Sequence, residues 1–317
     1  MNHVERSFRL EAPSGLGARP RPELIGPVLT HVHAALQDAV RMGFRHSSRA
    51  PGRVPRSLKA AAEVRFVGHE PADETATLLH FEVPTFGEAA AELFAQTQLW
   101  DDGPKPEQTA FELLGAAIAD VAAERIESSR FDPGLLRRIA GYGRLFRRDA
   151  LSRILLPDSA LQQPPWLDAA VTASAQRLAR ATPEPRRVRV SGRLDLMGVS
   201  QGVLKIHLPG GAVITALWDG RDAIEDFASQ LNRNVVCEGL AVFRPSGSLL
   251  RIDANAIAPA AEADAAFATL PIAVPASDIQ RAMRLRAGEP SPYAAFLRSV
   301  PAEETDEAFA DAVQALS

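Results

Sequence analysis

Residues 186–258 constrain the fold more than any other part of the chain, because apolar and polar side chains alternate there in short runs. Alternation with a period of two predicts β-strands that bury one face. Turns that contain glycine or proline separate the runs, as they do between neighbouring strands. The predicted strands cover residues 187–197, 202–208, 212–218, 234–243 and 249–257.

A short helix is predicted between the third and the fourth of these strands. Asp222 and Glu225 have the spacing of a capping box, which satisfies backbone amides at the start of a helix. Ile224, Phe227 and Leu231 follow at helical spacing and form an apolar stripe. The segment therefore reads as three strands, a helix and two strands.

This order of elements resembles that of an OB-fold, a five-stranded Greek-key barrel. Gly192 and Gly239 lie inside the first and the fourth predicted strands, where a glycine marks a bulge or a bend of a barrel. The resemblance implies binding through the second and third strands and the adjoining loops. An SH3-like barrel or another small barrel fits the same pattern.

The rest of the chain predicts helices mixed with strands, so the fold class is α+β. A strand is expected at residues 7–11, a hairpin at 63–68 and 77–83, and helices at 23–43, 107–127, 133–146 and 167–181. The proline-rich linker 182–185 marks a domain boundary. We therefore expect an α+β domain at 1–182, an OB-like barrel at 186–258, and an Ala/Pro-rich acidic tail at 259–317 with helices at 277–287 and 305–316.

Length and composition restrict the class of protein. A chain of 317 residues can form two domains with cores of their own. The single cysteine, Cys237, excludes an internal disulfide framework and is expected to be a buried, inert thiol. Neither a signal peptide nor a membrane span is visible, so a cytoplasmic location is expected. Richness in Ala, Arg and Pro is typical of a high-GC bacterial genome.

Basic side chains suggest two contact surfaces for nucleic acid or for a partner. One is the outer face of the barrel, and the other is a basic loop at 45–59 that contains no acid. The candidate contact residues are Arg189, Arg193, Lys205, His207 and Arg244 on the barrel, and Arg49, Arg53 and Arg56 in the loop. A solvated face or a protein interface explains the same charges.

Stacking on aromatic side chains is the second requirement of most single-strand binders. The barrel offers Trp218, Phe227 and Phe243, and the last two are expected in its core. Single-stranded DNA or RNA binding is therefore the alternative hypothesis, and protein binding is the leading one.

No catalytic or metal-binding motif is evident in the sequence. His31 and His33 point about 200° apart on a predicted helix, which is poor geometry for one metal ion. Residues 14–17 lack the lysine and the helix of a phosphate-binding loop. We therefore expect a non-enzymatic protein with no catalytic residues, cofactor or metal.

The acidic end of the chain resembles a short signature of small bacterial antitoxin-like proteins and of some uncharacterised barrel proteins. That signature is approximately W-P-G-D-E-T-D-E-E before a last helix, and residues 296–307 read FLRSVPAEETDE. The matching residues are Pro301, Glu304, Thr305, Asp306 and Glu307, whereas Val300 and Ala302 stand at the tryptophan and glycine positions.

The resemblance implies a tail that docks on a partner protein, as an acidic amphipathic helix docks in a basic groove. The docking residues would be Glu304, Asp306, Glu307, Phe309 and Val313. A capped terminal helix folded onto its own domain is the alternative. The leading hypothesis is a non-enzymatic bacterial binding or accessory protein, antitoxin-like or regulatory, whose partner is a toxin or a nuclease.

Overall fold

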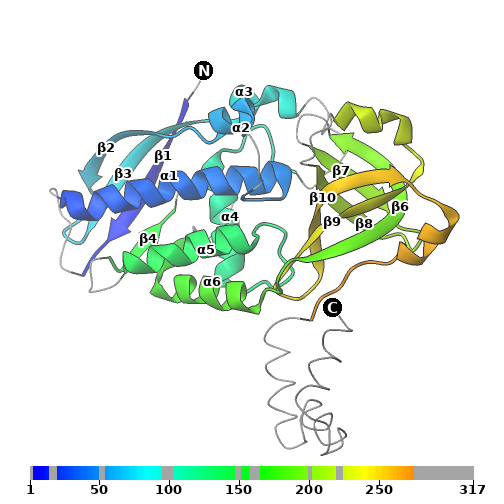
Figure 1. Cartoon of the computed structure of the whole chain (residues 1–317). Coiled ribbons are helices and arrows are strands. Elements are labelled where there is room, and N and C mark those ends of the chain that lie inside the picture. Colours follow the sequence, from blue (N-terminus) through cyan, green and yellow to red (C-terminus); the bar gives the residue numbers. More distant parts are fainter. Residues whose placement is uncertain are drawn as a thin grey trace, which may run out of the picture. The chain divides into compact units, whose positions relative to one another are not determined.

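The alternating segment closes into a five-stranded barrel in the computed structural model (Figure 1). The strands are β6 (Arg186–Gly198), β7 (Val203–His207), β8 (Val213–Trp218), β9 (Asn234–Phe243) and β10 (Leu249–Pro259). Their order is β10-β8-β7-β6-β9, and the β9–β10 pair closes the ring. Because β8 and β10 pair in parallel and the other pairs are antiparallel, this mixed barrel is consistent with an OB-like fold.

The alternation of the strands orients their side chains as predicted. Val190, Leu204 and Ile206 are fully buried in the barrel core, whereas Arg189 and Arg193 point outward. Cys237 is also fully buried, and burial raises the pKa of its thiol to about 12. The prediction of a buried thiol is confirmed.

The two strand glycines allow close approach between neighbouring strands. A Cβ on Gly192 would lie 2.6 Å from the carbonyl oxygen of His207, and one on Gly239 would lie 2.8 Å from Cα of Ala254. The irregularity in the β6–β7 pairing lies between Leu194 and Leu196 instead. Gly192 therefore marks tight packing rather than the bulge itself.

The element between β8 and β9 is a 3-10 helix, η4 (Ile224–Gln230), so the prediction of an α-helix was wrong in type. Phe227 packs edge-on against Trp218, with ring centroids 4.7 Å apart. Leu231, the last residue of the predicted stripe, is 41% exposed. Asp222 lies outside the residues that the structure describes, which are 3–13, 20–49, 54–94, 103–146, 151–156, 165–198, 202–218 and 224–274.

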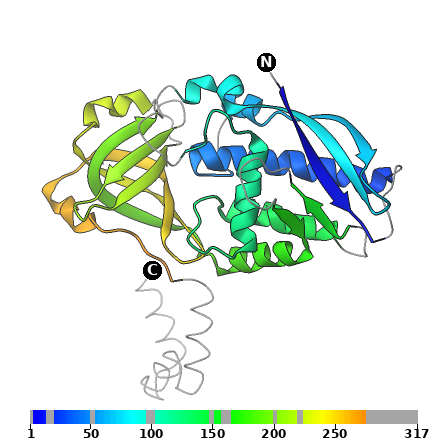
Figure 2. The same cartoon turned by 180° about the vertical axis from the view of Figure 1, so that it is seen from behind.

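The N-terminal part contains a five-stranded antiparallel sheet in the order β2-β3-β1-β4-β5 (Figure 2). Its strands are β1 (His3–Glu11), β2 (Arg65–Pro71), β3 (Ala76–Pro84), β4 (Arg153–Leu155) and β5 (Trp166–Asp168). The predicted hairpin is confirmed as β2–β3. The predicted strand at 7–11 is confirmed within a longer β1, and β4 and β5 were not predicted.

Helices pack with this sheet around one core that includes Phe8, Phe81 and Phe111. The α-helices are α1 (Pro22–Arg45), α2 (Arg56–Ala61), α3 (Phe86–Ala89), α4 (Ala110–Ala122), α5 (Pro133–Gly141) and α6 (Ala169–Ala181), and two 3-10 helices are η1 (Ala91–Leu93) and η2 (Tyr142–Arg144). The four predicted helices correspond to α1, α4, α5 and α6, each with shifted ends. Asp132 caps α5 as predicted, because its side chain accepts a hydrogen bond from the amide of Leu135 at 2.9 Å.

Residues that follow β10 still pack on the barrel. In the 3-10 helix η5 (Glu262–Phe267), Asp264 pairs with Arg189 of β6 at 3.0 Å. Ala273 is 8% exposed within the barrel core. Residues as far as Ala273 therefore contact the barrel. Residues 1–275 belong to one compact unit, and the predicted tail helices lie outside the described residues.

Candidate functional site

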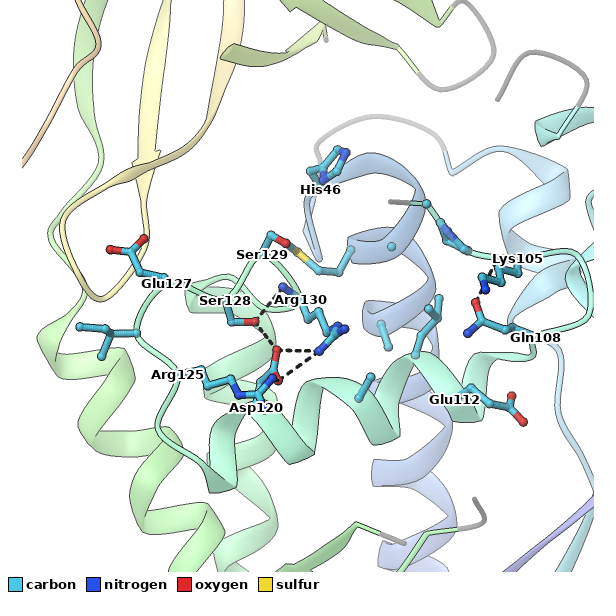
Figure 3. Close-up of a pocket in the computed structure, with 18 of the residues that line it drawn as sticks. His46, Lys105, Gln108, Glu112, Asp120, Arg125, Glu127, Ser128, Ser129 and Arg130 are labelled. Carbon is cyan, nitrogen blue, oxygen red and sulfur yellow. Dashed lines mark hydrogen bonds and ion pairs between the residues drawn. The ribbon is translucent and has the colours of Figure 1, made fainter. Parts of the chain in front are cut away.

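A cleft of about 900 Å³ lies between the C-terminal half of α1 and the outer side of α4 (Figure 3). We call it the α1–α4 cleft. Its apolar floor consists of Ala39, Met42, Gly43, Leu113 and Ala116. This volume is within the range of about 300–1,000 Å³ that is common for ligand sites.

The floor exists because α1 and α4 approach each other closely at a glycine. A Cβ on Gly43 would lie 2.8 Å from Cδ1 of Leu113 and 3.2 Å from Cγ of Pro104. A larger residue at position 43 would displace Leu113 and make the cleft shallower. α4 itself is positioned by a capping box in which Glu112 bonds back to the amide of Thr109 at 2.8 Å.

One end of the cleft is a network around a buried carboxylate. Asp120 is 3% exposed and accepts a hydrogen bond from Ser128 Oγ at 2.6 Å. Arg125 contacts it at 2.9 Å, and Arg130 contacts both of its oxygens at 3.1 Å. Figure 3 shows both guanidinium groups converging on Asp120. Two cations therefore share one anion.

The opposite end of the cleft is formed by Gly103, Pro104, Lys105, Gln108 and Glu112, of which Figure 3 labels the last three. Gln108 accepts a hydrogen bond from the amide of Lys105 at 2.8 Å, which fixes this turn beside α4. Glu112 points to Arg6 of β1, with a distance of 2.7 Å between Oε1 and Nη2. Arg6 thus neutralises the charge of the Glu112 carboxylate.

The barrel borders the cleft through the turn between β9 and β10. The amide of Ser246 donates to the carbonyl of Ile126 at 3.4 Å, and Ser248 Oγ donates to Glu127 at 2.7 Å. Val242 and Leu250, which flank the turn, join the core of the N-terminal part. The loop 124–130 is therefore held between α4 and the barrel.

His46 lines the cleft and ends α1 in the left-handed region, with φ of 53°. Burial lowers the pKa of its imidazole to about 4, and the positive charges of Lys205, Arg251 and Arg244 act in the same direction. The imidazole is therefore neutral at pH 7. All three of these cations belong to the barrel, and Arg251 is itself paired with Asp253 at 2.6 Å.

A buried ion pair joins the barrel to the N-terminal part. Arg251 of β10 contacts Asp132 at 3.3 Å, and their side chains are 6% and 3% exposed. Asp132 also accepts hydrogen bonds from the amide and the hydroxyl of Ser48 at 3.0 and 2.6 Å. Arg251 donates to the carbonyl of His46 at 2.9 Å. The residues that follow α1 are thus attached to both α5 and the barrel.

The structure separates the predicted contact residues of the barrel into two groups. Arg189 pairs with Glu238 and Asp264, whereas Arg193 and His207 both pair with Asp195 at 3.5 and 3.1 Å. These charges are balanced on the barrel surface itself.

The other two predicted residues lie near the cleft. Lys205 and Arg244 both act on the pKa of His46, and Lys205 Nζ donates to Thr215 at 2.7 Å. Arg244 donates to the carbonyl of Leu249 within its own turn. Lys205 and Arg244 therefore belong to the junction between the barrel and the N-terminal part.

The predicted basic loop is described only in part. Arg49 and Arg56 are exposed, and Arg53 lies outside the described residues. The tail residues Glu304, Asp306, Glu307, Phe309 and Val313 also lie outside them. These predictions stay predictions.

Sequence reasoning did not identify the α1–α4 cleft, Asp120 or Arg251 as parts of a site. One available signal was the dense polar run 124–130 directly after a helix. Arg251, in contrast, occupies an ordinary strand position, and nothing local indicates a partner that is 119 residues away.

Comparisons with known proteins assign no relative to this fold and cleft. No protein-family model, curated protein or solved structure matches the chain. Within the described ranges, no group of three or more His, Cys, Asp or Glu side chains is placed to bind a metal ion. No helix in that part of the chain is long and apolar enough to cross a membrane.

Proposed function

We propose that this chain is a non-enzymatic binding protein of the bacterial cytosol, which engages a partner protein through its acidic tail. The partner would be a toxin or a nuclease, and the chain would act on it as an antitoxin-like or regulatory protein. The observation that carries this proposal is the pattern of residues 303–316. There, an acidic segment precedes Phe309, Val313 and Leu316 at helical spacing.

The body of the protein supports a scaffold role for the barrel. Arg251 and Asp132 attach it through buried charges to α5 and to the end of α1. The turn between β9 and β10 adds a second attachment at Ile126 and Glu127. With these two attachments, the barrel can fix the end of α1, the start of α5 and the loop at Ile126 and Glu127 relative to one another.

The outer face of the barrel offers less support for nucleic-acid binding. Arg189, Arg193 and His207 each have a carboxylate partner within 3.5 Å. Trp218 and Phe243 are 7% and 0% exposed, so neither ring offers a platform on which a base can stack. Phe267 of η5 is 37% exposed, but the guanidinium of Arg189 lies over its ring, 4.9 Å from the centroid. Phosphates would therefore compete with existing ion pairs, and a base would compete with Arg189 for this ring.

The full chain is therefore expected to bind a labelled single-stranded oligonucleotide no more tightly than about 10⁻⁴ M at physiological salt, as in weak non-specific binding. Fluorescence anisotropy at two salt concentrations measures this affinity. Micromolar binding that weakens with salt, and that Arg193→Glu with Lys205→Glu reduces, would favour the nucleic-acid alternative. Arg233→Glu, at another exposed arginine, is the control for a general charge effect.

The role of the tail can be tested by co-expression with the products of genes adjacent to its own. A protein that ends at Pro275 keeps Ala273 in the barrel core, whereas a stop at Ala258 would remove it. We expect the intact chain to co-purify with one such product in a fixed ratio, and the chain that ends at Pro275 to lose it. Size-exclusion chromatography measures the complex.

Point variants in the full chain test whether the acidic side chains themselves bind the partner, because the tail segment is still present. Replacing Glu304, Asp306 and Glu307 with glutamine is expected to weaken the complex at least about tenfold, because each loses an ion pair. The matched control replaces the exposed acids Glu74, Glu92 and Glu107 with glutamine, which changes the net charge equally. Equal recovery of the partner by the intact chain and by the chain that ends at Pro275 would refute the proposed role of the tail.

A further inference from the structure

The floor of the α1–α4 cleft offers apolar surface to a partner. Gly43, Leu113 and Ala116 are half-buried, and Ile126 at the edge of the cleft is 51% exposed. Ile126 is held in this position by its backbone, because its carbonyl accepts the amide of Ser246. Ile126 therefore adds an exposed apolar side chain to the half-buried apolar residues of the floor.

The carboxylates around the cleft are already engaged by the protein itself. Glu112 bonds to Arg6, Asp120 to two arginines, and Glu124 to Arg177. Glu127 accepts from Ser248 and stays ionised, because this contact and the nearby cation of Arg244 both lower the pKa of its carboxyl. Each of these carboxylates therefore has a cation of the protein itself beside it.

The cations of the cleft keep unused hydrogen-bonding capacity. Arg125 and Arg130 contact Asp120 through Nη1, and their side chains are 64% and 54% exposed. Each guanidinium carries further N–H donors that are free to bind another carboxylate. Lys105 is exposed at the opposite end and forms no ion pair within the described part of the chain.

The rim beside the barrel adds little net charge. Arg251 pairs with Asp132 at 3.3 Å and with Asp253 at 2.6 Å, and Arg244 lies near the carboxylate of Glu127. The two ends of the cleft therefore favour negative charge, and the floor favours apolar side chains.

We propose that the α1–α4 cleft docks an acidic segment of a partner protein, whose apolar side chains cover Leu113 and Ile126 while its carboxylates bind Lys105, Arg125 and Arg130. This is a second docking surface, separate from the acidic tail. It does not depend on the proposed function of the tail, and the two surfaces can be tested apart.

The probe is a short fluorescein-labelled peptide with glutamates at both ends and Leu and Phe between them. We expect saturable binding to the full chain that weakens as salt is raised, because the contacts are charged and partly exposed. Two control peptides carry lysine in place of glutamate, or serine in place of Leu and Phe. Neither control should bind measurably. A labelled single-stranded oligonucleotide tests whether any polyanion is accepted.

Two substitutions place the binding in the cleft. Lys105→Glu is expected to weaken the peptide about five- to tenfold through charge reversal, and Ile126→Ser by a similar factor through lost apolar contact. The matched controls are Lys59→Glu and Ile272→Ser, at exposed positions outside the cleft. These controls should bind the peptide as the unchanged chain does.

Several results would overturn the proposal. They are absence of saturable binding by the acidic peptide, equal binding of the lysine peptide or the oligonucleotide, and equal losses in cleft and control variants. The chain that ends at Pro275 should bind the peptide as tightly as the full chain does. If the tail experiment fails but the peptide binds as expected, the cleft is still supported as a docking site. Thermal unfolding verifies that each variant is folded.

Discussion

Arg251→Met is expected to lower the free energy of unfolding by about 3–5 kcal/mol, because it leaves a buried carboxylate without its cation. Asp132 would keep its contacts with Ser48 and with the start of α5 but would lose Arg251. Methionine fills much of the same space, so the loss reports the charge and the hydrogen bonds of Arg251, including those to His46 and Asp253, rather than a cavity. Urea unfolding followed by circular dichroism measures the change.

The matched control is Arg193→Met, which removes an exposed pair with Asp195. That change should cost less than about 1 kcal/mol, since exposed ion pairs contribute little. The double variant Arg251→Met with Asp132→Asn should be less destabilised than the sum of its single variants, because the two charges are coupled. Similar losses at Arg193 and Arg251 would contradict the importance of this junction.

Gly239→Ala is expected to destabilise the barrel by about 3 kcal/mol, at the upper end of overpacking effects. The added Cβ would meet the carbonyl oxygen of Asp253 and would lie 2.8 Å from Cα of Ala254. Both atoms belong to the backbone of β10, so no side-chain rotation relieves the clash. Because β9 and β10 close the barrel, their separation would open it.

Hydrogen exchange at the amides of β9 and β10 should rise in this variant more than exchange in the N-terminal sheet. Gly210→Ala is the control, because a Cβ at that position meets no atom within 4 Å. It should leave the free energy of unfolding within about 0.5 kcal/mol. Unchanged stability of Gly239→Ala would show that the two strands can move apart at little cost.

The contacts between the barrel and the N-terminal part also affect the proposed docking site. Arg251 bonds to the carbonyl of His46, and the turn after β9 bonds to Ile126. The barrel therefore holds His46 and Ile126, which both line the cleft. Arg251→Met should weaken binding of the acidic peptide even though Arg251 does not line the cleft.

The barrel was predictable because its strands alternate over one buried face. Val190, Leu204 and Ile206 carry that pattern, and each is fully buried. The cap at Asp132 was predictable for a similar reason, since a capping aspartate acts on its own helix. Both signals are local, so a single sequence contains them.

The elements that were missed lack a local signal. β4 and β5 have three residues each, too few to show a period, and they exist because β1 and each other provide hydrogen-bonding partners. Leu167 and Asp168 fell at the start of the helix predicted at 167–181, whereas they belong to β5 and Asp168 caps α6. The 3-10 form of η4 likewise shows no distinct pattern.

By itself, the sequence determined the α+β class, the strand and helix periodicity, a small five-stranded barrel and a buried Cys237, because these follow from patterns within a few residues. The tertiary structure alone decided that Arg251 meets Asp132, that the outer arginines of the barrel are balanced by carboxylates, and that α1 and α4 leave an open cleft. Those features are pairings between distant segments, and residue type says nothing about which distant partner the fold brings near.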